Sequence, residues 1–306
     1  MNIIQLLKNR IHKILINVVK KGIAEYDDKS LYWHNLEFFL MRSALSSTIL
    51  GISNENYFSN SKVIISLTTY GKRIYDVYLA IESIMQQTIK PNLIILWLED
   101  ELKNADLPIT LQNQMKRGLQ IRYCKNIKSF KKLIPTLHHY PDDIIITIDD
   151  DVIFSYDMIE NMLSDYKRNP NFIYSNRMHR IHMIDDCTAD KYVNWEFESN
   201  NPEVSALNFP TGCGGILYPP HSLDQEVLNE NAFMELCPKG DDIWFKAMSL
   251  MNNVQCRLVH IHTPYMKVID RLQGDGLCIE NVDGGLNDIQ FNNVFKKYNL
   301  YTLLHS

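Results

Sequence analysis

The chain of 306 residues is 45% hydrophobic and 22% charged, with a formal net charge of −5. This composition is that of a globular protein, with enough residues for one large domain or two small ones. The negative balance and the lack of a Lys/Arg stripe interleaved with aromatic residues argue against a dedicated nucleic-acid binder, so no nucleic-acid partner is expected.

The first 22 residues combine an apolar stripe with basic flanks. Apolar residues recur at helical spacing from Ile3 to Val18, and every charged residue before Glu25 is Lys or Arg. These charges interrupt the stripe too often for a membrane-spanning helix or a secretory signal. Two interpretations stay open: an interfacial helix on an anionic cytoplasmic leaflet, or a helix packed against its own domain.

A polar patch at 53–61 separates the helical first fifty residues from segments that alternate between strand and helix patterns. Continuous apolar runs, which parallel strands covered on both faces require, occur at 62–67, 92–98, 119–124 and 143–148. Helical patterns follow the first three of these runs at 75–87, 107–118 and 130–140. The alternation predicts a doubly wound α/β fold, with a mostly parallel central sheet flanked by helices. Such sheets bind ligands at the carboxyl ends of their strands, near a switch in strand order.

The second half of the chain has another character. From 176 to 220 we expect shorter strands mixed with polar and aromatic residues. A helical pattern returns at 240–253, where Asp241 and Asp242 would lie at the positive end of the helix dipole. A tail rich in Gly, Asp and Asn leads to a last predicted helix at 287–298.

Six cysteines are scattered along the chain without a C-x-x-C pair, so the sequence signals neither a zinc knuckle nor a redox motif. We expect free thiols in a reducing cytoplasm, and a protein that is cytoplasmic, with or without peripheral contact on the inner face of the cytoplasmic membrane.

Three consecutive carboxylates, Asp149, Asp150 and Asp151, end the apolar run at 143–148. Carboxylates crowded at a strand end are usually neutralised by a cation, and oxygen ligands suit Mg²⁺ or Mn²⁺. Alternate residues of an extended strand point the same way, so Asp149 and Asp151 are expected to share one ion. The competing interpretation is a solvated acidic turn, since a D-x-D pattern alone is weak.

Four motifs in order extend this interpretation. They are 80–97 (AIESIMQQTIKPNLIILW), 147–152 (TIDDDV), 209–219 (FPTGCGGILYP) and 240–245 (GDDIWF). The chain resembles glycosyltransferases of the GT-A (Rossmann-like) fold over roughly 62–262. More narrowly, it is similar to the family-two-like bacterial group associated with surface polysaccharide genes, such as those for capsule or lipopolysaccharide.

The resemblance implies a role for each aspartate. Asp149 would contact the nucleotide and Asp151 would coordinate Mn²⁺ or Mg²⁺ on the donor diphosphate, while Asp150 would be structural or touch the donor sugar. The loop after the first strand would also hold the nucleotide, through Thr68, Tyr70 and Arg73.

The second predicted strand ends in Glu99 and Asp100, where the family has an acidic pair that reads the base. The pair is shifted here, so these two residues are the candidates for base recognition. Lys131 and Lys132 lie where the fold supplies a cation to the diphosphate, although a solvated helix face is an equally simple interpretation.

Glycosyl transfer with inversion needs a carboxylate that takes the proton of the acceptor hydroxyl. Asp242 is the first candidate for this general base and Asp241 the second, although one of them would be a helix cap in the plainer interpretation.

Further candidates are weaker. His262, with His260 behind it, is a candidate metal ligand, although a lone histidine is more often structural. The glycines at 212–215 would let the backbone approach a sugar. Trp195, Tyr218 and Trp244 are candidates to stack on sugar rings, although such residues are more often core.

These observations predict a helical segment at 1–58, a GT-A domain at 59–270 and a C-terminal tail with a helix at 271–306. The expected activity is metal-dependent transfer of a sugar from a nucleotide-diphosphate donor, with UDP as the expected nucleotide, to a hydroxyl of a glycan or lipid-linked glycan. Competing expectations are a sugar-phosphate nucleotidyltransferase, a non-catalytic sugar-binding relative and a retaining transferase. The single glycine in the loop at 66–73 counts against the first of these, and the intact carboxylates count against the second.

Overall fold

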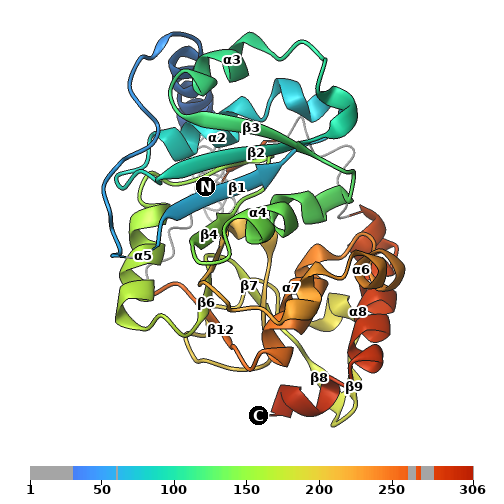
Figure 1. Cartoon of the computed structure of the whole chain (residues 1–306). Helices are drawn as coiled ribbons and strands as arrows, with labels where there is room; N and C mark the ends of the chain where they lie inside the picture. Colours follow the sequence, from blue (N-terminus) through green and yellow to red (C-terminus); the bar gives the residue numbers. More distant parts are fainter. Residues whose placement is uncertain (1–29, 60, 261–266, 270–278, 306) are drawn as a thin grey trace, which may run out of the picture.

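The computed structural model describes residues 30–305 except 60, 261–266 and 270–278. A seven-stranded sheet forms its centre (Figure 1). In spatial order the strands are β12 (Cys256–Leu258), β6 (Ile173–Ser175), β11 (Ile216–Tyr218), β4 (Ile144–Thr147), β1 (Val63–Thr68), β2 (Leu93–Glu99) and β3 (Leu119–Cys124). The predicted α/β fold with a mostly parallel central sheet is therefore confirmed.

The strand order reverses beside β1. The chain runs from β1 to β2 and β3 on one side, and then crosses to β4 on the other side of β1, with all these pairs parallel. β11 is antiparallel to both β4 and β6, and β12 is parallel to β6. The switch point lies between β1 and β4, so a ligand is expected at the carboxyl ends of these two strands.

Helices cover both faces of the sheet. In Figure 1, α4 crosses in front of the strands, while α6, α7 and α8 gather beside one another near the C-terminus. Their bounds are α2 (Tyr78–Met85), α3 (Ile109–Met115), α4 (Ile134–His139), α5 (Met158–Arg168), α6 (Glu230–Leu236), α7 (Asp241–Met251) and α8 (Leu286–Lys297). Residues 30–46 are also helical.

Short elements complete the described chain. Three two-stranded pairs join β7 (Met178–Arg180) with β10 (Asn208–Pro210), β5 (Val152–Ile153) with β13 (Lys267–Val268), and β8 (Met183–Asp185) with β9 (Thr188–Ala189). Single turns of tight helix are η1 (Gly71–Tyr75), η2 (Asp100–Leu102), η3 (Lys128–Lys132), η4 (Tyr192–Asn194), η5 (Gly212–Gly214), η6 (Gln225–Leu228) and η9 (Tyr301–His305), and η8 (Ile279–Asp283) is a π-helix.

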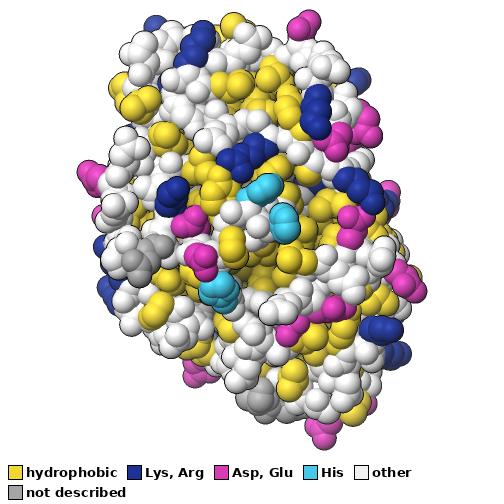
Figure 2. Space-filling view, viewed as in Figure 1, with side chains coloured by type: hydrophobic (Ala, Val, Ile, Leu, Met, Phe, Trp, Pro, Cys, Tyr) yellow, Lys and Arg dark blue, Asp and Glu magenta, His cyan; other side chains and the backbone are white. Residues whose placement is uncertain are grey.

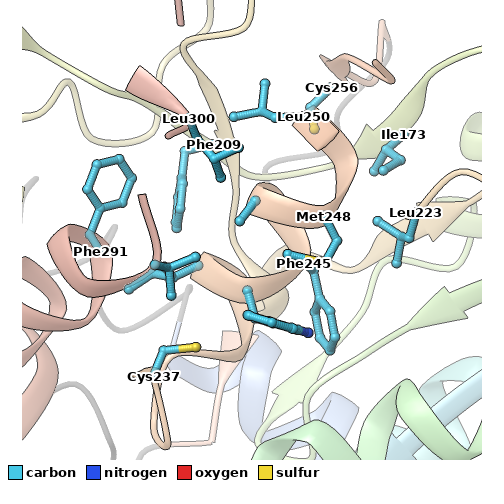
Figure 3. Close-up of a cluster of buried hydrophobic side chains, with 14 of the residues drawn as sticks. Ile173, Phe209, Leu223, Cys237, Phe245, Met248, Leu250, Cys256, Phe291 and Leu300 are labelled. Carbon is cyan, nitrogen blue, oxygen red and sulfur yellow. The ribbon is translucent and has the colours of Figure 1, made fainter. Parts of the chain in front are cut away.

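The apolar runs became strands because both of their faces are buried. Ile65 of β1 packs in a cluster with Ile81 and Ile84 of α2, whereas Ile64 faces the opposite side with Trp97. A larger cluster surrounds α7, whose Phe245 and Met248 are shown in Figure 3. Alternate residues of a buried strand contact different layers, so a continuous apolar run is required.

Surface features agree with an ordinary globular chain. Figure 2 shows acidic, basic and apolar side chains interspersed over the visible face.

Among the described residues, no helix has both the length and the apolar character needed to cross a bilayer. The predicted basic helix at 1–22 lies outside the described residues. Five of the six cysteines are described, and these five are free thiols.

A buried ion pair joins α2 to α3 and to the helix at 30–46. Arg117 donates two hydrogen bonds to Glu82, at 2.8 and 2.9 Å, and both side chains are at most 2% exposed. Gln114, Gln86 and Ser43 also donate to this carboxylate. Burial alone would raise the pKa of Glu82, but these hydrogen bonds, above all that from Arg117, hold it below its ordinary value.

Replacing Arg117 by methionine should lower the free energy of unfolding by about 3–5 kcal/mol, because Glu82 would stay buried without its cation. Urea denaturation measures the change. Lys103→Met is the control, since its pair with Asp100 is half exposed and should contribute at most about 1 kcal/mol. Equal losses in the two variants would contradict the structural role assigned to Arg117.

Candidate functional site

A cavity of about 600 Å³ lies at the carboxyl ends of β1 and β4, at the switch in strand order. Most of the side chains expected from the sequence line it: Thr68, Tyr70, Arg73, Glu99, Lys131, Lys132, Asp149, Asp150, Asp151, Asp241 and Asp242. Segments distant in the sequence meet here, because the carboxyl ends of neighbouring parallel strands share one edge of the sheet.

The aspartate triplet is arranged differently from the expectation. β4 ends at Thr147, and Asp150 and Asp151 form a turn instead of continuing the strand. One nitrogen of Arg73, Nη1, donates to both Asp150 (2.8 Å) and Asp151 (3.1 Å). Asp149 accepts from Lys132 at 2.9 Å instead. The extended geometry expected for Asp149 to Asp151 was therefore wrong, since the chain turns here, but both carboxylates still line the same cavity and their sharing of one ion stays a prediction.

Asp150 is the most enclosed of the three aspartates. Its side chain is 7% exposed, and besides Arg73 it accepts a hydrogen bond from the hydroxyl of Thr69. Burial raises the pKa of Asp150 to about 6, against the opposing charge of Arg73. Thr69, which sequence reasoning missed, fixes this carboxylate from the end of β1.

Lys132 connects the two groups of carboxylates. Its ammonium lies 2.9 Å from Asp149, 2.9 Å from Asp241 and 4.0 Å from Asp242. Burial alone would lower the pKa of Lys132, but these three carboxylates, Asp149 first, hold it well above its ordinary value. Lys132 is thus a buried cation engaged by protein carboxylates, and the interpretation of a solvated helix face was wrong.

The two carboxylate oxygens of Asp242 have different surroundings. The backbone N–H of Gly212 donates to Oδ2 at 2.9 Å, whereas Oδ1 is buried and accepts no hydrogen bond from the described residues. Burial raises the pKa of Asp242 to about 7, with Lys132 opposing the shift. Its neighbour Asp241 accepts from the hydroxyl of Ser129 at 2.8 Å. A carboxylate that lines a cavity and has its pKa raised to about 7 can take up a proton near neutral pH.

Gly212 is a glycine for a reason that the sequence did not show. A Cβ atom at this position would lie 2.4 Å from Nζ of Lys132, 3.1 Å from Asp242 and 3.3 Å from Asp149. The glycine therefore makes room for the Lys132 ammonium and its carboxylates. We expected the glycine loop to admit a sugar, and at Gly212 that space is filled by the protein itself.

The two residues predicted to recognise the base lie in different surroundings. Glu99 lines the cavity and pairs with the buried Lys131 at 2.8 Å. Asp100 pairs with Lys103 on the surface and is not among the cavity-lining residues. The structure therefore keeps Glu99 as a candidate and removes Asp100, because the chain turns into η2 directly after β2.

Thr68 and Tyr70 border the cavity beside Arg73. The hydroxyl of Thr68 donates to the backbone carbonyl of Trp97, which holds the end of β1 against β2. The ring of Tyr70 is 42% exposed, with its centroid 5.1 Å from the guanidinium carbon of Arg73. A partly exposed ring over a cation offers a face on which a planar group can stack.

No metal site made by protein alone exists among the described residues, where no group of three or more His, Cys, Asp or Glu side chains is placed to hold an ion. The cavity does present the carboxylates of Asp149 and Asp151. This donor set suits a hard divalent ion that takes one or two protein carboxylates and completes its shell with phosphate oxygens and water. The fit is therefore to an ion that arrives with a phosphate ligand.

The predicted histidine ligands do not contribute here. His262 lies outside the described residues. His260 lines a separate recess with Asp165 and Arg257, and its backbone N–H donates to Asp165 at 2.6 Å. The structure thus places His260 away from the aspartates.

The predicted stacking residues belong to the core. Trp195, Tyr218 and Trp244 are 5%, 2% and 0% exposed, and none of them lines the cavity. The aromatic wall of the cavity comes instead from Tyr192 and Phe197, which sequence reasoning missed. Aromatic residues occur throughout this segment, and only the tertiary structure decides which of them face inward.

Arg177 and His179 also line the cavity and were missed. Arg177 donates to Glu198 at 3.0 Å and to the Thr211 hydroxyl at 2.9 Å. His179 accepts a hydrogen bond from the backbone N–H of Glu198 at Nδ1. Burial lowers the pKa of His179 to about 3, so its ring is neutral. No local motif marks these residues: the pairing of β7 with β10 brings His179 to the site, and Arg177 directly precedes β7.

Comparisons with known proteins show weak likeness only. No family model and no curated protein matches the chain. Among solved structures it is similar to CMP:2-keto-3-deoxy-manno-octonic acid synthetase complexed with CTP, with 14% identity, 65% of this chain and 89% of that chain covered, and a TM-score of 0.37. It is also similar to residues 1–349 of S. aureus TarS, with 15% identity, 78% and 73% covered, and a TM-score of 0.46. At these values, neither likeness assigns an activity.

Replacing Lys132 by methionine should destabilise the protein by about 2–3 kcal/mol at neutral pH, because Asp149 and Asp242 lose their cation. Their pKa values in the folded state would rise further above those in the unfolded chain. The loss should therefore be small at about pH 4 and grow as pH rises toward 7 and above.

Urea denaturation of both proteins across this pH range tests the prediction. Lys131→Met is the matched control, since it removes a neighbouring buried lysine whose partner, Glu99, is 25% exposed. A loss for Lys132→Met that does not change with pH would show that Lys132 contributes by packing alone.

Proposed function

We propose that this chain is a GT-A glycosyltransferase that transfers a sugar, with inversion, from a nucleotide-diphosphate donor such as a UDP-sugar. The acceptor is a hydroxyl group of a glycan or lipid-linked glycan, in the synthesis of a surface polysaccharide. The observation that supports this proposal best is the meeting of two carboxylate groups in one cavity. The triplet after β4 and the pair at the start of α7 both contact Lys132, through Asp149 and Asp241.

The donor side is built from the ends of β1 and β4. Asp149 and Asp151 would hold Mn²⁺ or Mg²⁺, and the ion would neutralise the negative charge that develops on the leaving diphosphate. Arg73 supplies a guanidinium that suits phosphate oxygens, and Tyr70 supplies an exposed ring face for the base. Thr68 and Glu99 border the same region of the cavity.

Asp242 is the proposed general base. The acceptor oxygen attacks the anomeric carbon, the bond from that carbon to the diphosphate oxygen breaks, and the acceptor proton moves to the carboxylate of Asp242. Asp242 lines the cavity with a side chain that is 27% exposed, and the backbone N–H of Gly212 fixes its orientation through Oδ2. Asp241 holds Lys132 in place, so the two neighbouring carboxylates have different tasks.

Nucleotide release tests the reaction class. In the presence of Mn²⁺ and a panel of nucleotide sugars, the protein should release nucleoside diphosphate, and Asp151→Ala should abolish the release. Asp242→Asn should keep nucleotide binding but lose transfer by about 10²–10⁴-fold. Asp142→Asn, at an exposed surface pair, is the control and should change neither property.

Two outcomes would contradict these assignments. Transfer at the normal rate by Asp242→Asn would remove Asp242 as the base. Release of pyrophosphate from a nucleoside triphosphate and a sugar phosphate would identify a nucleotidyltransferase instead.

The pH dependence should report the ionisation of Asp242. The base acts only when it is ionised, and its pKa is raised to about 7. The value of kcat/KM should therefore fall about tenfold per pH unit below neutrality and level off above about pH 8. Rate measurements with saturating metal check this expectation, and a profile that stays flat down to about pH 5 would exclude a base of this kind.

A further inference from the structure

Arg73 occupies the position between two carboxylates of the triplet. One nitrogen of its guanidinium, Nη1, lies 2.8 Å from Oδ1 of Asp150 and 3.1 Å from Oδ2 of Asp151. The guanidinium is largely enclosed, with a side chain 11% exposed. It comes from η1, the turn after β1, which begins at Gly71 with a φ of 53°. The protein therefore brings its own cation to the place where an acidic strand end needs one.

A divalent ion and this guanidinium compete for one position. An ion bound to Oδ2 of Asp151 would lie about 2.0–2.2 Å from that oxygen. Nη1 of Arg73 already donates to the same oxygen. Two cations a few ångströms apart in a largely enclosed site repel each other strongly, so the ion can bind there only when Arg73 withdraws.

We propose that Arg73 is a place-holder for the metal, which neutralises Asp150 and Asp151 until the donor arrives and then transfers to the donor diphosphate. This inference rests on the proposed function, because it takes the incoming ligands to be a divalent ion and a nucleoside diphosphate. When both arrive together, the ion takes the carboxylate and the guanidinium takes phosphate oxygens, to which it can donate two parallel hydrogen bonds. When the ion arrives alone, Arg73 loses Asp151 and gains no anion.

Strong coupling between the two ligands follows. Metal binding without nucleotide must break the ion pair between Arg73 and Asp151 without replacing it. When nucleotide binds as well, Arg73 exchanges that pair for one with the diphosphate. By linkage, the factor by which nucleotide improves metal affinity equals the factor by which metal improves nucleotide affinity. Asp150 keeps its place during the exchange, because the hydroxyl of Thr69 also donates to it.

The experiment measures Mn²⁺ binding to the full chain by electron paramagnetic resonance, with and without UDP, at about pH 8, where carboxylates are ionised. In the wild type, UDP should increase Mn²⁺ affinity about tenfold or more. Arg73→Gln should bind Mn²⁺ alone about tenfold more tightly than the wild type, because the competing cation is gone. The same variant should bind UDP in EDTA about tenfold more weakly, because Asp150 and Asp151 would then face the diphosphate without their cation and repel it.

These opposite changes separate a place-holder from a fixed structural pair. Lys72→Gln is the matched control, since Lys72 is an exposed cation of the same turn and does not line the cavity. It should leave both affinities within about twofold, as expected for a solvated surface charge.

An Arg73→Gln variant that binds both ligands more weakly, or binds Mn²⁺ alone no better than the wild type, would overturn the proposal. If circular dichroism shows that this variant does not fold, measurements on the wild type still test the proposal. Equal Mn²⁺ affinity of the wild type with and without UDP would also overturn it. Failure of the proposed function is a separate result. If UDP and Mn²⁺ binding are coupled but no sugar donor releases nucleotide, the place-holder role of Arg73 stands and the transferase proposal fails. If nucleotide is released but the two ligands are not coupled, the transferase proposal stands and the place-holder role fails.

Discussion

The structure of the site depends on one buried ammonium group, that of Lys132. A buried charge without partners costs several kcal/mol, so the carboxylates around it must stay within reach of it. Asp149 after β4 and Asp241 at the start of α7 meet this requirement, each at 2.9 Å. Gly212 leaves the space that the ammonium occupies, since a Cβ atom at that position would lie 2.4 Å from Nζ of Lys132. The two halves of the fold are therefore joined at the point where the proposed chemistry takes place.

A second cation, Arg73, holds the other end of the triplet, so the acidic cluster is divided between two basic residues. This division explains how three consecutive aspartates persist at the end of a buried strand. It also gives them different properties. Asp150 and Asp151 share the guanidinium of Arg73, whereas Asp149 shares Lys132 with Asp241. The charges held by the buried Lys132 need little reorganisation when a reaction shifts charge across the site.

Away from the cavity, the fold keeps its carboxyl edge in place by ordinary means. Both faces of β1 and β2 are covered, and the buried pair of Glu82 and Arg117 anchors α2, α3 and the helix at 30–46. The last helix, α8, contributes Phe291 and Phe295 to the same cluster as α7, whose first turn carries Asp241 and Asp242. The carboxylates at that turn are thus positioned by core packing on the side remote from the cavity.

The sequence by itself determined the strands and the place of the aspartates. Apolar runs such as 143–148 can be satisfied only between two covering layers, and a polar residue after such a run must emerge at the edge of the sheet. The tertiary structure alone decided the ion pairs, because Lys132 meets Asp241, and Arg73 meets Asp150, across long stretches of chain. Local patterns cannot separate a buried lysine from a solvated one, or a core tryptophan from one that faces a ligand. Both outcomes depend on which distant segment packs against the residue. For this reason Asp100 lies on the surface and Trp244 in the core, whereas Thr69 and Arg177 line the cavity.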